Sequence, residues 1–185
     1  MRVVIPGFRE AVDRERAIRN QSYLDLPETL CGVEVKPLTL RKLILLGEIE
    51  SPFVVGGHVT PYHIGAFFVV MTERTGFSKW RLLRQVSFLN AESAIEAIKS
   101  FLDEAFQDSP PQGDGEEASY YSFAASLVDV FASQYGWTRD AVIDSPLKCI
   151  FQELKSITKR NRPDAIMFNP SDRVRGQWLA EMNRN

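Results

Sequence analysis

The chain contains few of the residues on which most catalytic and metal-binding sites depend. Its 185 residues include only two cysteines, Cys31 and Cys149, and two histidines, His58 and His63. The cysteines lie far apart, each among apolar neighbours, so we expect small buried thiols in a reducing compartment rather than a disulfide framework. The histidines lie five residues apart across an expected helix start, unlike the HExxH spacing of a zinc-binding helix. We therefore expect a structural or surface role for both histidines.

Long apolar runs and a strong charge of one sign are also absent. The most apolar run, "GAFFVVM" at residues 65–71, is too short to span a bilayer. The first 20 residues lack the apolar core of a secretory signal. A formal net charge of -2 argues against a dedicated nucleic-acid-binding protein, which is usually clearly basic. These absences predict a soluble cytoplasmic protein that binds neither membrane nor nucleic acid.

No motif for covalent or cofactor chemistry is present. No serine or cysteine occupies a recognisable nucleophile turn, and Gly56 and Gly57 precede a helix start without the lysine and hydroxyl residue of a phosphate loop. We expect the carboxylates of Glu48, Glu50 and Glu104 on solvated helix faces. We therefore assign no catalytic residue, no cofactor and no metal ligand, and expect a non-enzymatic protein. The alternative, an enzyme using a metal or a nucleotide, rests only on the two histidines and the glycines.

Helical periodicity dominates the rest of the chain. Apolar residues recur at steps of three or four, often after a capping residue such as Thr39 or Thr60, which predicts a series of helices. These helices are expected near residues 8–20, 39–50, 60–73, 77–89, 91–108, 118–134, 139–144 and 146–160. Their inward faces are expected at Leu40, Leu43, Ile44 and Ile49; at Ile64, Phe67, Phe68 and Met71; at Ile95, Ile98, Leu102 and Phe106; at Phe123, Leu127, Val130 and Phe131; and at Leu147, Ile150, Phe151, Leu154 and Ile157.

One short segment departs from this periodicity. Cys31, Val33 and Val35 alternate with polar residues between two prolines, which predicts a strand or hairpin arm near residues 29–38, with residues 2–5 as a candidate partner. The expected fold is therefore mainly α, a compact domain of six to eight helices with a minor β-hairpin or strand.

An acidic segment divides the chain into two expected parts. Residues 108–117, "DSPPQGDGEE", contain two prolines, two glycines and four acidic residues, too few apolar groups to offset the entropy of ordering. We predict an N-terminal helical part with the small β element at 1–107, a linker or loop at 108–117, and a C-terminal helical part at 118–185. The last 31 residues carry seven basic and three acidic residues, a basic tail that we interpret as a solvated helix face.

Residues 132–154, "ASQYGWTRDAVIDSPLKCIFQEL", which we call the joint, hold two helix stops and two helix starts. Gly136 is placed to end the first helix in the left-handed conformation, so that Trp137 folds back onto the last turn. Thr138 is a suitable N-cap for the short helix that follows. Ser145 and Pro146 are expected to repeat this arrangement as cap and first residue of the last helix.

The joint resembles the tail assembly chaperones of long-tailed bacteriophages. The resemblance lies in an aromatic-Gly-Trp turn, a polar cap with an acidic residue, and a D-x-P-L entry into a helix containing FQxLK. It is strongest over residues 118–160, and residues 30–57 also look like the N-terminal part of such a protein. The matching residues are Tyr135, Gly136, Trp137, Thr138, Asp140, Ile143, Pro146, Leu147, Phe151 and Leu154.

The resemblance implies a small, mainly helical, non-enzymatic protein in the host cell cytoplasm. Such chaperones bind the long tape measure protein, keep it soluble, and help recruit tail tube proteins around it. The family has no catalytic residue to carry over. The alternative is a structural virion protein of the tail or of the head–tail connector.

Five apolar residues are candidates for binding the partner. Trp137 and Phe151 belong to the joint, where core packing is the favoured role of each. Phe168, Trp178 and Leu179 lie in a polar tail interrupted by prolines, where a terminal apolar helix would bind a partner or dock on its own domain.

Overall fold

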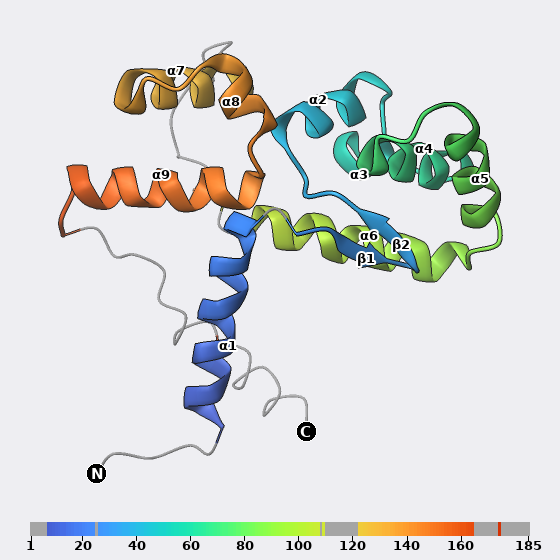
Figure 1. The fold of residues 1–185 in the computed structure, drawn as a ribbon, viewed down its shortest axis with the longest axis horizontal. Helices are drawn as coiled ribbons and strands as arrows, with labels where there is room; N and C mark the ends of the chain where they lie inside the picture. Colours follow the sequence, from blue (N-terminus) through green and yellow to red (C-terminus); the bar gives the residue numbers. More distant parts are fainter. Residues whose placement is uncertain (1–6, 25, 108, 110–121, 165–173, 175–185) are drawn as a thin grey trace.

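The computed structural model describes residues 7–24, 26–107, 109, 122–164 and 174. Within these residues the chain forms nine α-helices, one 3₁₀-helix and one two-stranded antiparallel sheet, so the predicted mainly α fold with a minor hairpin is confirmed. Helices α2 to α6 and the hairpin occupy one end of the structure, α7 to α9 occupy the other, and α1 extends away from both (Figure 1). No helix in the described part is long and apolar enough to cross a membrane.

The elements follow the order of the sequence pattern closely. Their bounds are α1 Phe8–Gln21, η1 Ser22–Leu24, β1 Glu28–Leu30, β2 Val33–Val35, α2 Leu40–Glu48, α3 Pro52–Val55, α4 Pro61–Thr72, α5 Gly76–Val86, α6 Ala91–Phe106, α7 Phe123–Tyr135, α8 Arg139–Asp144 and α9 Leu147–Asn161.

The hairpin pairs β1 with β2, in a register that places Leu30 opposite Val33. Cys31 and Gly32 both have positive φ, as the two central residues of a tight hairpin turn require. Cys31 therefore lies in the turn and not on the strand face with Val33 and Val35, which corrects its predicted position. The two valines are buried, and both cysteines of the chain are free thiols. The candidate partner strand at residues 2–5 lies outside the described residues.

Two threonines begin helices as the sequence predicts. The Thr39 hydroxyl accepts a hydrogen bond from the Lys42 amide at 3.3 Å, and Thr60 is the N-cap of α4, with Pro61 as its first residue. The predicted inward face of α4 is confirmed, because its phenylalanines and Met71 are fully buried.

The predicted inward face of α2 is partly wrong. Leu40 and Leu46 are buried, whereas Ile44 and Ile49 are exposed. Because α2 has apolar residues on two sides, its contacts with α4 and α8 decide which side faces the core. The second apolar side is therefore left at the surface.

One hydrophobic core joins the two ends of the molecule. It contains Val35 and Phe67 from the part before residue 108, and Phe131 and Phe151 from the part after residue 117. Helix α2 contacts α8, and α6 contacts α9. Of the predicted linker, only Ser109 lies within the described residues.

Candidate functional site

The joint has the turn geometry that its sequence predicts. Gly136 ends α7 with a φ of 67°, its amide donates to the Ala132 carbonyl at 2.9 Å, and the Trp137 amide donates to the Phe131 carbonyl at 3.4 Å. The indole of Trp137 lies 5.2 Å from the Phe131 ring, measured between centroids. The Thr138 hydroxyl accepts from the Ala141 amide at 3.2 Å and so caps α8. The residues between α7 and α8 thus form a fixed turn packed against the core.

The entry into α9 differs from the prediction by one residue. Pro146, not Ser145, is the N-cap, and the Ser145 hydroxyl donates to the Ala141 carbonyl at the end of α8. The reason is a contact with the segment before α2: the Leu147 amide donates to the Leu38 carbonyl at 2.9 Å, and Pro146 forms an isolated β-bridge with Thr39. This pairing holds Pro146 extended and delays the helix start to Leu147.

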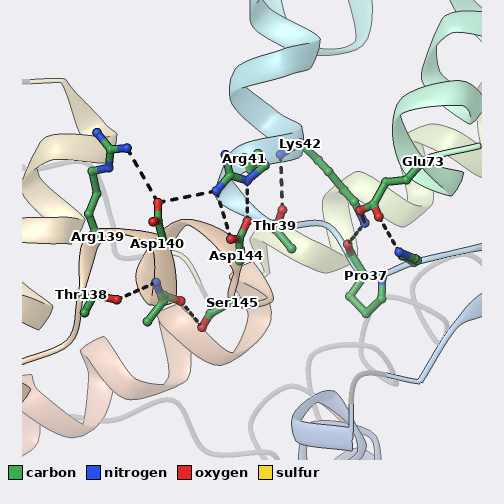
Figure 2. Close-up of polar contacts among 12 residues, drawn as sticks. Pro37, Thr39, Arg41, Lys42, Glu73, Thr138, Arg139, Asp140, Asp144 and Ser145 are labelled. Carbon is green, nitrogen blue, oxygen red and sulfur yellow. Dashed lines mark hydrogen bonds and ion pairs between the residues drawn. The ribbon is translucent and has the colours of Figure 1, made fainter. Parts of the chain in front are cut away.

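Ion pairs add a second connection between the joint and α2. Figure 2 shows the Arg41 side chain reaching from α2 toward the two aspartates of α8. Its guanidinium donates to both carboxylate oxygens of Asp144, at 2.5 and 3.0 Å, and lies 3.7 Å from Asp140. The hydrogen bond from Arg41 lowers the pKa of Asp144 below its ordinary value. These charges are paired with one another, which makes the cluster a structural connection between elements.

A buried lysine lies on the opposite side of α2. The Lys42 ammonium donates to the Pro37 carbonyl at 2.8 Å and lies 3.4 Å from Glu73 (Figure 2), while burial lowers the pKa of Lys42. Lys36 also donates to Glu73, and this hydrogen bond lowers the pKa of that carboxylate. The hydrogen bonds and charges of this group are satisfied internally, so it presents no free donor set for a ligand.

The predicted partner-binding residues lie in different environments. Phe151 is fully enclosed, with 0% exposure, and packs beside Phe106 and Phe123. Trp137 is half-buried and packed against the core. The remaining three candidates, Phe168, Trp178 and Leu179, lie outside the described residues.

His63 has a structural role at the start of α4. Its Nδ1 atom accepts a hydrogen bond from the Thr60 amide at 3.1 Å, which completes a capping box with the Thr60 side chain. His58 is exposed in the preceding loop. Among the described residues, no group of three or more His, Cys, Asp or Glu side chains could hold a metal ion.

Helix α5 carries an exposed aromatic face that the sequence analysis did not single out. Phe77 is 86% exposed, Trp80 is 72% exposed, and Phe88, two residues beyond the helix, is 80% exposed. These residues recur at helical steps together with Arg81 and Arg84. The opposite face of α5 holds the buried residues Leu82 and Val86.

An apolar groove of about 490 Å³ lies between α4 and α5, and the exposed aromatic residues of α5 are not part of its lining. Apolar side chains and Tyr62 dominate its lining, and Lys79 stands at the α5 wall. The helices approach closely at Gly65, where an added Cβ would lie only 3.1 Å from Leu83 Cδ2. The apolar lining includes Ile49, Ile64, Ala66, Val69, Val70 and Leu83.

We call the groove and the exposed aromatic residues on the outer side of α5, Phe77, Trp80 and Phe88, the α4–α5 surface. Trp80 lies about 60° round α5 from the lining residue Leu83, and Phe77 lies about 120° from it. The chemistry of this surface suits noncovalent binding of an apolar ligand, because exposed aromatic and aliphatic groups lose contact with water when covered. A sequence signal for its outer side exists: in α5 the aromatic residues alternate with Arg81 and Arg84, whereas Leu82, Leu83 and Val86 recur on the other side, three, four and seven residues after Lys79.

A scan against protein-family models, a search of curated proteins and a search of solved structures each return no match to this chain.

Proposed function

We propose that this protein is a non-enzymatic tail assembly chaperone of a long-tailed bacteriophage, acting in the host cytoplasm. Its client is the tape measure protein, whose apolar helical segments it covers until tail tube proteins assemble around them. The observation that carries the proposal is the α4–α5 surface, which combines an apolar groove with three large exposed aromatic side chains on the outer side of α5. The resemblance of the joint to this family supplies the identity of the client.

The physical requirements of this function agree with the surface. A chaperone must release its client, so a modest apolar groove suits it better than a large obligate interface. A groove between two helices can bind an amphipathic helix through apolar residues at positions i, i+3, i+4 and i+7. Helix α5 spans 11 residues, or about 16 Å, which matches about three turns of such a helix.

Co-expression tests the proposal directly. We expect the chain to raise the soluble yield of the tape measure protein of the same phage, and the double variant Phe77→Ser/Trp80→Ser to lose most of that gain. The matched control is Lys99→Glu, on the exposed side of α6 and away from the groove. An unchanged yield of soluble tape measure protein with the native chain would reject the proposal.

The protein composition of the purified particle distinguishes the chaperone from the alternative, a structural virion protein. Mass spectrometry of purified virions should detect no copies of a chaperone. A fixed copy number per particle would instead assign the chain to the tail or the head–tail connector.

A further inference from the structure

We infer that the α4–α5 surface binds a single amphipathic helix with acidic residues along the flank that faces α5. This inference rests on the proposed function in taking a helix as the ligand, and it adds the chemistry by which that helix is recognised. It is carried by the charge of α5, by the shape of the groove and by the lack of carboxylate partners for the cations among the described residues.

The charge of this region is one-sided. Residues 74–91 contain four basic side chains, Arg74, Lys79, Arg81 and Arg84, and no acidic one. None of the four forms an ion pair with another described residue. Elsewhere in the described part, Arg41, Lys42 and Lys148 are paired with carboxylates.

The positions of these cations around α5 determine which of them lie near the groove. Lys79 and Leu83 line its α5 wall, and an α-helix turns 100° per residue. Trp80 and Arg84 therefore lie about 60° and 100° further round α5 from Leu83, on the solvent side of the wall. By the same rule Lys79 lies about 40° from Leu83 in the other direction. A helix seated in the groove would therefore contact Lys79 and Leu83, and Arg84 would act on its charges at longer range.

The part of the groove that lies beside the end of α2 carries charge of the opposite sign. Ile49 lines it from the end of α2 and is preceded by Glu48 and followed by Glu50, both exposed. Acidic residues on the flank of a bound helix that lies toward Ile49 would place like charges near Glu48 and Glu50. The favoured ligand is thus acidic on one flank only.

The same observations favour a protein helix over a membrane surface. A helix that lies on a bilayer separates its apolar face from its basic face. On α5 the aromatic residues are interleaved with Arg81 and Arg84 on one exposed side, while Leu82, Leu83 and Val86 are buried against the core or line the groove. A concave groove also fits a convex helix and not a flat bilayer.

Binding of designed peptides to the full chain tests the inference. The first peptide is a stabilised helix with leucines at i, i+3, i+4 and i+7, glutamates along one flank and glutamines along the other. The second peptide replaces each glutamate by lysine. We expect the glutamate peptide to bind, and to bind more weakly as salt is raised from 50 to 300 mM, which shortens the screening length from about 14 Å to about 6 Å.

Charge reversal on the protein provides the matched comparison. In Lys79→Glu/Arg84→Glu, we expect affinity for the glutamate peptide to fall about tenfold and affinity for the lysine peptide to rise. Trp80→Ser should weaken both peptides, whereas Lys99→Glu should change neither. Circular dichroism checks that each variant is folded, which is expected because these side chains are exposed.

Three results would overturn the inference. One is equal binding of both peptides to the native chain and to the reversed variant. Another is loss of binding in Lys99→Glu equal to that in Lys79→Glu/Arg84→Glu. The third is binding of phosphatidylserine vesicles, or of a single-stranded oligonucleotide, with no binding of the glutamate peptide. None of these results depends on the tape measure protein, so failure here is distinct from failure of the co-expression test.

Discussion

At the scale of single residues, the joint depends on one backbone conformation. Gly136 has a φ of 67°, and a Cβ there would meet no atom within 4 Å, so conformation and not space decides which residue fits. Gly136→Ala should lower the free energy of unfolding by about 1 kcal/mol. In a domain of this size that corresponds to a fall in Tm of about 3 °C.

The control for this substitution is Gly47→Ala, inside α2. Gly47 is helical and an added Cβ would also meet nothing within 4 Å, so alanine should leave stability unchanged or raise it by up to about 1 kcal/mol. Thermal unfolding followed by circular dichroism measures both variants. Equal effects of the two substitutions would show that Gly136 is not held in the left-handed conformation.

The ion pair between Arg41 and Asp144 makes part of the stability depend on pH. The folded-state pKa of Asp144 lies below its unfolded value, so the stabilisation is complete above the ordinary aspartate pKa of about 3.9 and is lost as pH falls through the folded value. Asp144→Asn should therefore have a lower Tm than the native chain at pH 7, and the difference should shrink as pH falls below the ordinary aspartate pKa and through the folded value. Asp129→Asn, which removes an exposed carboxylate with no ion pair to a described residue, is the control. If the Tm of the native chain and the Tm of Asp144→Asn changed in parallel with pH, the prediction would be contradicted.

Residue-scale features were predictable where the cause is local. The roles of Gly136, Thr138 and Thr60 follow from backbone conformation and capping, which depend on neighbours in sequence. Pro146 was misplaced by one residue because its partner, Thr39, lies more than 100 residues away. A distant backbone contact leaves no mark on the local pattern.

At the scale of elements, α5 separates a buried side from an exposed one. Leu82 is fully buried, so Leu82→Ala should lower the free energy of unfolding by about 2–5 kcal/mol. Trp80→Ala removes a larger side chain from the exposed side and should change it by no more than about 0.5 kcal/mol. Urea denaturation measures both values. A loss of several kcal/mol in Trp80→Ala would mean that the indole is part of the core.

The inward side of a helix was predictable only where its largest apolar residues share one side. Helix α4 has apolar residues on more than one side, but its largest ones, Phe67, Phe68 and Met71, share the predicted inward side and are buried. Helices α2 and α5 have apolar residues on two sides, so the choice depends on neighbouring helices. For α5 the close approach to α4 at Gly65 is decisive, and a glycine in a sequence does not reveal which helix it faces.

At the scale of the whole molecule, one core should make the two ends unfold together. Phe151→Ala in α9 should lower the free energy of unfolding by about 3–5 kcal/mol. Hydrogen exchange should show equal losses of protection in α9 and in α4, because Phe151 and Phe67 belong to the same core. Phe77→Ala, the same substitution at an exposed site, should leave both helices protected. Loss confined to α7 and α9 would show that the ends unfold separately.

The pairing of Leu147 with Leu38 also sets an order of events while the chain is being made. The two residues are 109 positions apart, and ribosomes add about 5–20 residues per second. The apolar sides of α2 and α6 therefore wait roughly 5–20 s for α8 and α9 to be synthesised and cover them. Slower elongation between these two positions lengthens that exposure, so the yield of folded protein should depend on the speed of translation.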